Sequence, residues 1–143
     1  MALPLLDLGI VSKPIIEVGV RSREGGRARV LAVFDTGSHV SIIREAKLPS
    51  GARVTRYAKA ERLLTAAHGG QLRVTGEAIL YIEIGRKLIR AAVSVSPDLR
   101  RDMLIGAGAM QEWDISIHNG HGKTTVAVGR DLRDPELTEV DAL

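Results

Sequence analysis

The sequence predicts an all-β domain, a small closed or sandwiched β-fold with one short α-helix near its C-terminal end. Two observations lead to this prediction. Short apolar runs follow one another closely, and Gly, Asn and Pro residues separate them, as is typical of small β-barrels and sandwiches. Helical periodicity is scarce, and the best helix candidate is the stretch from Ala107 to Trp113.

The composition fits one globular domain. A chain of 143 residues is long enough to bury a core,. Aromatic residues make up only 3%, so aliphatic side chains must fill that core and a base-stacking surface is not expected,. The net charge of +3 comes from 20 Lys and Arg against 17 Asp and Glu, and the positive residues are scattered. We therefore expect no nucleic-acid partner.

The chain contains no cysteine, which excludes disulfides, thiolate nucleophiles and Cys-ligated metals,. The stretch from Met1 to Asp7 is apolar but has no basic flank, so it is a poor signal peptide,. No run approaches the roughly 18 apolar residues of a membrane span. We expect a cytoplasmic protein with no membrane partner.

The first hairpin delivers an acid to the edge of the core. Ile15 to Val20 and Arg27 to Phe34 are predicted strands around a polar turn. The uninterrupted apolar run from Val30 to Phe34 predicts a strand buried on both faces,. The run ends in Asp35, where an unpaired buried charge would be unfavourable.

The middle of the chain reads as further short elements. Val40 to Ile43 is a third β-prone run, and Arg44 to Leu48 forms one helical turn. Glu61 to Thr75 predicts a hairpin with Ala67 to Gln71 at its tip,. Gly76 is expected to break that run.

The last part continues with hairpins. Glu77 to Ile84 and Lys87 to Val95 are predicted strands, and Met103 to Gly106 is an apolar strand end before the helix. Asp114 to Ile117 and Thr124 to Val128 are expected to form the final hairpin. Its turn is predicted at Asn119-Gly120, a strong hairpin signal,. We expect residues 1–130 to form the domain. Residues 131–143 form a charged tail, either a short helix beginning at Asp134-Pro135-Glu136 or a frayed end,.

The motif that carries chemistry is Asp35-Thr36-Gly37-Ser38. Taken alone, such a short match also fits a strand followed by a polar turn, with Asp35 accepting backbone N–H bonds. In order and spacing, however, the chain from Pro14 to Ile117 resembles the retropepsin-like aspartic proteases. The resemblance includes a Pro-led first strand, the Asp-Thr-Gly-Ser strand end, a flap-like hairpin at Thr65 to Gly70, the run Val74 to Glu77, and Asp102 to Gly106 before a short helix.

This resemblance implies a closed β-barrel of the retropepsin type and an aspartic endopeptidase acting on peptide or protein substrates. Hydrolysis needs two carboxylates that share a proton, one acting as base on water and the other as acid on the carbonyl oxygen, as is established for aspartic proteases. The chain has one Asp-Thr-Gly, so Asp35 would meet its symmetry mate in a homodimer,. No metal or cofactor is implied.

The family motif also implies roles for the residues beside Asp35. Thr36 would bond to the backbone of the partner, and Gly37 would allow the tight turn and the approach of substrate. Ser38 would donate a hydrogen bond to the carboxylate and favour its charged form. Retroviral members usually carry Ala there, so this bond predicts a more acidic pH optimum than theirs.

Substrate binding is expected at two places. The flap residues Ala67, His68, Gly69 and Gly70 would close over an extended peptide, which adds as a strand,. Leu104 and Ile105 would line the site, support it from beneath, or simply belong to the core.

Two positions depart from the retroviral pattern. An acid after Asp-Thr-Gly-Ala and an Arg after Ile-Gly form an ion pair in the viral enzymes, but His39 and Ala107 stand there in this chain. The dimer interface must then be built differently, and the last hairpin from Asp114 to Val128 is a candidate.

Two other interpretations remain open. A retropepsin-fold module that only dimerises or binds peptides, without catalysis, would share the fold. His118 and His121 form a His-x-x-His pattern in a loop, but no third ligand is evident for zinc,. We interpret them as solvated turn residues.

Overall fold

The structure is a computed structural model that describes residues 13–65, 70–120 and 122–133. Nine strands, one short α-helix and one 3-10 turn follow one another in these ranges. They are β1 (Ile15–Arg21), β2 (Arg27–Phe34), β3 (Ser41–Arg44), η2 (Glu45–Lys47), β4 (Thr55–Thr65), β5 (Gly70–Ile84), β6 (Lys87–Ser96), β7 (Met103–Ile105), α2 (Ala107–Glu112), β8 (Ile115–Gly120) and β9 (Lys123–Val128).

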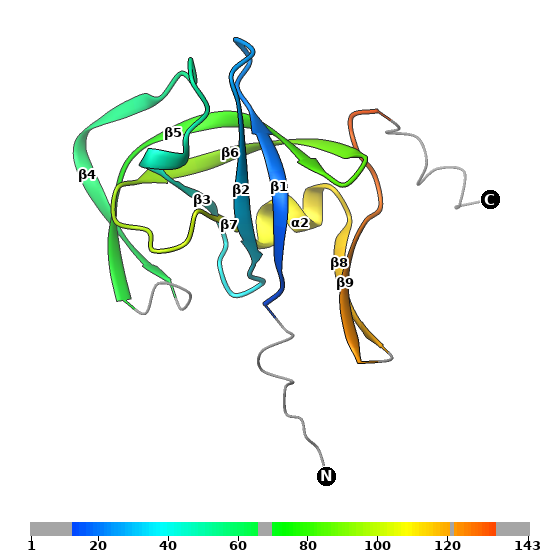
Figure 1. The fold of residues 1–143 in the computed structure, drawn as a ribbon. Coiled ribbons are helices and arrows are strands. Elements are labelled where there is room, and N and C mark those ends of the chain that lie inside the picture. Colours follow the sequence, from blue (N-terminus) through cyan, green and yellow to red (C-terminus); the bar gives the residue numbers. More distant parts are fainter. Residues whose placement is uncertain (1–12, 66–69, 121, 134–143) are drawn as a thin grey trace.

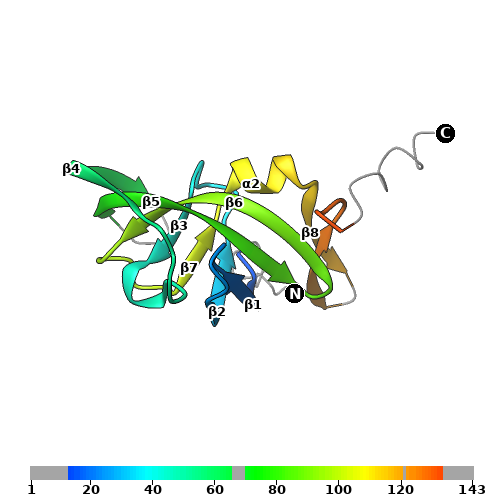
Figure 2. The same ribbon diagram turned by 90° about the horizontal axis from the view of Figure 1, so that it is seen from above.

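The main sheet closes on itself. Its order is β1-β2-β7-β3-β6-β5-β4, and an additional pairing of β1 with β5 joins the ends of the ring. The predicted closed β-barrel with one short helix near the C-terminal end is therefore confirmed. β4 lies outside the ring and pairs only with β5, on one side of the barrel in Figure 1. Seen from above, β5 and β6 run along most of the molecule (Figure 2).

A second layer of core covers the strands that lead to Asp35. One cluster fills the barrel and includes Ala32 and Phe34 of β2. A second cluster lies on the other face of the same strand, with Val33, Leu104 of β7 and Leu72 of β5 among its members. Each side chain of this kind contributes about 1.5–3 kcal/mol when it is fully buried. Strands between two such clusters have no polar face, which explains the uninterrupted apolar runs.

The prediction that Val30 to Phe34 is buried on both faces holds only for its end. Leu31 is 53% exposed. Its N–H donates to Asp102 Oδ2 at 3.0 Å, so the backbone at this point is satisfied by a side chain. Double burial begins at Ala32, where β2 starts to pair with β7.

Two glycines do not act as the sequence suggested. Gly76 does not break the run, because β5 continues through it and bends out of the barrel to pair with β4. Glycine is needed there for space: a Cβ would lie 2.5 Å from the Thr55 carbonyl oxygen. Asn119-Gly120 is not the turn of the last hairpin. Both residues pair within β8–β9, and the turn falls between Gly120 and Lys123, with Gly122 at φ +74°.

The β8–β9 hairpin forms a separate two-stranded sheet that projects beside the barrel (Figure 1). After it, the chain returns to the barrel. Asp131 is 1% exposed and its Oδ2 accepts the Leu88 N–H at 2.7 Å, while the Leu132 N–H donates to the Leu88 carbonyl oxygen at 2.7 Å. The possible helix at Asp134-Pro135-Glu136 lies outside the described residues.

Candidate active site

Asp35 stands directly after β2, at the edge of the core. Its N–H donates to the Ile105 carbonyl oxygen at 2.9 Å, which extends the parallel pairing of β2 with β7 by one bond. The residue is 1% exposed. The doubly buried strand end therefore carries the carboxylate to a place that water scarcely reaches.

The two carboxylate oxygens of Asp35 have different surroundings. Oδ1 accepts the Gly37 N–H at 2.9 Å. Oδ2 is buried and has no hydrogen-bond partner among the described residues. The Lys13 ammonium lies 4.0 Å from Oδ2, and that side chain is 42% exposed. Because buried polar atoms are nearly always hydrogen-bonded, Oδ2 is the atom of this loop that an additional partner would satisfy.

The start of α2, the helix after β7, is hydrogen-bonded to the loop that follows Asp35. The first amides of α2 find their acceptors in the loop: the Ala107 N–H donates to the Ser38 carbonyl oxygen at 2.7 Å, and the Gly108 N–H to that of His39 at 3.3 Å. The first N–H groups of a helix have no intrahelical partner and need such acceptors. Backbone bonds to the end of β7 and from the start of α2 therefore fix the conformation of the loop.

Ser38 does not make the predicted bond. Its hydroxyl donates to the Val40 carbonyl oxygen at 2.8 Å, and a serine hydroxyl has only one proton to donate. Ser38 is 7% exposed and braces its own loop rather than the Asp35 carboxylate. The predicted bond to Asp35 is absent, so the acidic pH optimum inferred from it loses its basis.

Gly106 permits the close approach of β7 to the loop. A Cβ there would lie 2.4 Å from the Val40 carbonyl oxygen and 2.6 Å from that of Ser38, both backbone atoms. Its N–H donates to the buried Ser41 hydroxyl at 3.0 Å. No larger residue fits this position without moving the loop.

Leu104 and Ile105 are completely buried. The Leu104 side chain belongs to the cluster outside the barrel that also contains Val33 and Leu72, which we call the outer cluster. The Ile105 side chain belongs to the cluster that fills the barrel. They support the loop from beneath, and within this chain neither side chain reaches a surface where a substrate would lie. The alternative of core support describes both side chains in the single chain, and their contact with substrate stays a prediction.

Thr36 and Gly37 are exposed at the tip of the loop. Thr36 borders a cavity of about 510 Å³ between the loop, α2 and the start of β8. Its side chain makes no hydrogen bond to the described part of the chain, so its role toward a partner stays a prediction. A Cβ on Gly37 would come within 3.2 Å of Asp35 Oδ1, which crowds the carboxylate.

The arm that β4 and β5 form is present, but most of its tip is not described. Ala67, His68 and Gly69 lie outside the described residues, and Gly70 pairs with Thr65 at the last described rung. The expected contact of these four residues with substrate therefore stays a prediction.

Tyr57 on this arm packs against the outer cluster. Burial raises the pKa of the Tyr57 hydroxyl above its ordinary value. The nearby carboxylates of Glu77 and Glu61 raise it further, and so does the hydrogen bond to Glu77. The arm thus contacts the core layer that supports Asp35.

Two residues near the site were given no role by the sequence. Asp102 accepts the Arg44 guanidinium at 2.7 Å and the Leu31 N–H at 3.0 Å, and so connects the start of β7 to the middle of β2 and to the end of β3. An acid just before a buried apolar strand could have indicated such a brace. Lys13 could have been noticed only as a lone cation before Pro14, which does not predict its contact with Asp35.

Of the two histidines in the His-x-x-His pattern, the structure describes only His118. His118 Nε2 lies 2.8 Å from the Ser116 hydroxyl on an exposed part of β8, and His121 is outside the described residues. Within the described ranges, no three His, Cys, Asp or Glu residues gather as metal ligands. No helix in these ranges is long and apolar enough to cross a membrane.

The closed barrel, the braced Asp-Thr-Gly-Ser loop and the following helix define a single-lobe β-barrel with one acid at its edge. The family "retroviral aspartyl protease" matches residues 11–118, more than half of the chain. The chain therefore belongs to the retroviral aspartyl protease family.

A solved structure gives the same result for the fold. The EIAV protease complexed with the inhibitor HBY-793 is similar with a TM-score of 0.55, over 75% of this chain and 93% of that one. The two share 14% sequence identity, so the likeness concerns the fold alone. No curated protein matches the chain.

Proposed function

We propose that the chain is an aspartic endopeptidase that works as a homodimer, with one Asp35 from each subunit. The observation that supports this most is the buried Oδ2 of Asp35, which has no hydrogen-bond partner in the described part of its own chain. A second Asp35 carboxylate that shares a proton with it would satisfy this atom. The sequence contains no second Asp-Thr-Gly to do so within one chain.

The reaction follows from that pair. The ionised carboxylate takes a proton from a water molecule, whose oxygen attacks the peptide carbonyl carbon. The protonated carboxylate donates to the carbonyl oxygen, and proton transfer to the departing amine then completes cleavage. The chain itself provides the acid–base groups, so the proposal requires no metal or cofactor.

The loop geometry suits a pair of this kind. Asp35 Oδ1 is held by the Gly37 amide, which leaves Oδ2 as the oxygen available to the partner. Thr36 is exposed beside it, where its hydroxyl can bond to the other subunit. Because α2 and β7 fix the loop backbone, two copies would meet with little loss of freedom.

The substrate would be an extended peptide bound between the loop and the arm of β4 and β5. Main-chain hydrogen bonds to the flap would hold it as an added strand, with Ala67, His68, Gly69 and Gly70 as the contacting residues. The hydrolysis would take place in the cytoplasm.

The dimer interface is proposed to include the β8–β9 hairpin. This hairpin pairs with no barrel strand, and most of its side chains are exposed or half-buried. Two-stranded hairpins are marginally stable alone, so a second copy beside it would supply contacts that the single chain lacks. The retroviral ion pair cannot serve here, because His39 and Ala107 occupy its positions.

The decisive experiment compares the wild type with Asp35→Asn on a broad peptide library between acidic and neutral pH. We expect cleavage to fall by a factor of about 10²–10⁴ or more, while sedimentation shows that the dimer persists. Glu112→Gln, which removes an exposed acid on the nearby helix, is the control and should keep full activity.

Mixing tests the shared site directly. Excess Asp35→Asn is allowed to exchange subunits with the wild type. The activity per wild-type subunit should then fall toward the fraction of wild-type subunits in the mixture, because a mixed dimer holds only one Asp35. Unchanged activity, or a strict monomer at micromolar concentration that still cleaves, would contradict the dimeric dyad. If the wild type cleaves no peptide, the alternative of a catalytically inactive dimerisation or peptide-binding module replaces this proposal.

A further inference from the structure

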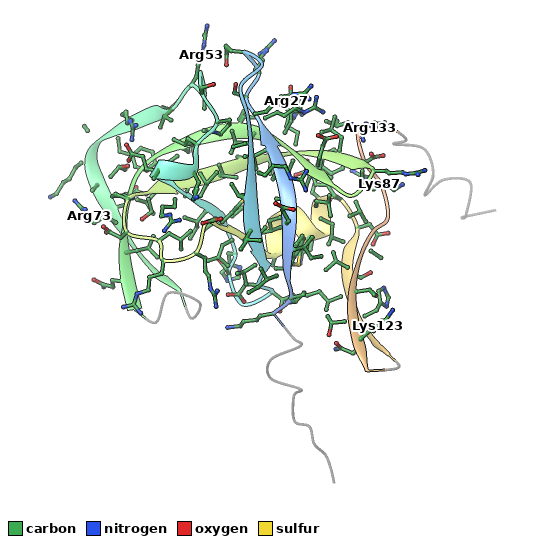
Figure 3. All side chains as sticks on the ribbon, viewed as in Figure 1. Arg27, Arg53, Arg73, Lys87, Lys123 and Arg133 are labelled. Atoms are coloured by element: carbon green, nitrogen blue, oxygen red, sulfur yellow. The ribbon has the colours of Figure 1, made fainter. Side chains whose placement is uncertain are left out.

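The outer surface of the barrel carries a row of cationic side chains at the end far from Asp35. The strand register places Arg27 of β2 opposite Arg21 of β1, Arg21 opposite Tyr81 of β5, and Tyr81 opposite Arg90 of β6. We call these four residues the arginine row. Residues directly opposite on neighbouring strands share one face and lie about 5 Å apart at Cβ. In Figure 3, Arg27 lies at the end of the molecule away from the N-terminal end of β1.

The row brings three guanidinium groups together on one face of neighbouring strands. Like charges directly opposite one another destabilise a sheet. The neighbouring acid is Glu83, whose Oε1 lies 3.9 Å from Arg21 Nε and whose Oε2 accepts Arg133 at 2.9 Å. The Arg133 hydrogen bond holds the pKa of Glu83 below its ordinary value, and the charges of Arg21 and Arg27 act in the same direction. The Glu83 carboxylate therefore interacts with Arg21, Arg27 and Arg133 together.

Two further features lie at the row. Arg21 Nε is buried and has no hydrogen-bond acceptor among the described residues. Beside it lies a cavity of about 360 Å³, lined by Arg21, Arg23 and Arg27 together with the Tyr81 ring and Leu88. Guanidinium groups match carboxylates with paired hydrogen bonds. The surface therefore fits an acidic segment whose carboxylates enter the cavity.

The sequence continues after Arg133 with an acidic segment. Residues 134–143 include Asp134, Glu136, Glu139 and Asp141, and no Lys or Arg. The preceding residue, Arg133, bonds to Glu83 Oε2 and to the Arg86 carbonyl oxygen. Glu83 pairs with Leu88 two rungs beyond the pair of Tyr81 and Arg90, and therefore on the same face of the sheet,.

The length of this segment is sufficient. The row spans three gaps between strands, about 14 Å in total, and ten residues reach up to about 33 Å when extended. A short tether also gives the segment a high effective concentration at the row.

We propose that the arginine row is the docking site for residues 134–143 of the same chain, whose carboxylates pair with Arg21, Arg27 and Arg90. The interaction is electrostatic and depends on salt. It does not depend on hydrolysis at Asp35.

The test uses the full chain in two forms, the wild type and a neutralised form with Asp134→Asn, Glu136→Gln, Glu139→Gln and Asp141→Asn. A fluorescent peptide of residues 134–143 is added to each, and anisotropy is measured at increasing salt. The neutralised chain should bind the peptide, and the affinity should fall steeply with salt. The wild type should bind it at least several-fold more weakly, because its own segment competes.

Single substitutions in the neutralised chain locate the site. Arg27→Gln and Arg21→Gln should each weaken binding about tenfold. Lys123→Gln is the matched control, since Lys123 lies at the tip of β8–β9 (Figure 3) and should leave the affinity unchanged. Arg27 is exposed, so Arg27→Gln keeps the test valid even if Arg21→Gln impairs folding.

Two results would overturn the proposal. If the peptide does not bind at low salt, or binds equally well to Arg27→Gln, the row is not the docking site. If the wild type and the neutralised chain bind equally, the attached segment does not occupy the row, which then serves a separate acidic partner.

Discussion

Charged side chains stand at both ends of the β1–β2 hairpin, and the two ends differ in burial. Past the end of β2, Asp35 is 1% exposed and one of its oxygens has no hydrogen-bond partner among the described residues. At the turn, Arg21 and Arg27 stand opposite each other, with Arg27 exposed. Water hydrates and salt screens the exposed charges. Water and salt do not reach the buried Oδ2 of Asp35 in this way.

This difference decides what kind of partner each end can accept. A buried carboxylate oxygen needs one partner at hydrogen-bond distance and fixed orientation, which a symmetric second copy provides. Exposed guanidinium groups on long side chains accept an acidic segment in many arrangements. Substitutions in the backbone around Asp35 should accordingly lower the stability of the fold strongly. Substitutions at or beside the arginine row should change stability only slightly, by an amount that depends on pH and salt.

The largest effect on stability is expected for Gly106→Ala. The added methyl group would overlap the carbonyl oxygens of Val40 and Ser38 at 2.4 and 2.6 Å. We expect a loss of about 1–3 kcal/mol in the free energy of unfolding, measured with urea, together with loss of cleavage. Gly120→Ala is the control, because nothing lies within 4 Å of its added Cβ. An unchanged stability of Gly106→Ala would show that the loop is not tightly held.

A smaller effect is expected for Ser38→Ala. The variant removes the bond from the Ser38 hydroxyl to the Val40 carbonyl oxygen, which should lower the free energy of unfolding by about 1 kcal/mol,. The pH dependence of cleavage should keep its position, because the hydroxyl is not bonded to Asp35. A shift of the profile toward higher pH would instead restore the role that the sequence suggested.

The smallest effect is expected beside the arginine row, for Glu83→Gln. The neighbouring arginines lower the pKa of Glu83 in the folded chain, so its charge stabilises the fold above the ordinary pKa of a glutamate,. That contribution is lost as the pH falls through the lowered pKa. Urea unfolding should therefore show a slightly less stable variant near neutral pH and equal stabilities in strong acid. A variant that is equally stable at both pH values would contradict this ion pairing.

The order of elements could be read from the sequence because local patterns determine it. β1, β2 and the helix after β7 fall at or within one residue of their predicted bounds. Glycine was the ambiguous signal. Gly76 marks a close approach of two strands and not a break, and a sequence contains no information about which backbone lies beside a residue.

The candidate site was predictable as a stretch of residues but not as a set of contacts. Asp35 could be found because an apolar run ends in an acid within a family motif. The direction of the Ser38 hydroxyl could not, because Val40 competes with Asp35 for the same proton at similar sequence distance. Asp102 was also missed, since its partners Leu31 and Arg44 lie 71 and 58 positions away.

An apolar run that ends in Asp35 was enough to predict that a buried strand end delivers one carboxylate to the edge of an all-β core, and the sequence shows no second Asp-Thr-Gly. Strand pairing in three dimensions sets which oxygen of Asp35 has no hydrogen bond among the described residues and which backbone groups hold its loop. It also decided that Arg21, Arg27 and Arg90 stand in one row with Tyr81. The physical reason is that burial patterns are local, whereas strand register and hydrogen-bond partners join residues far apart in the chain.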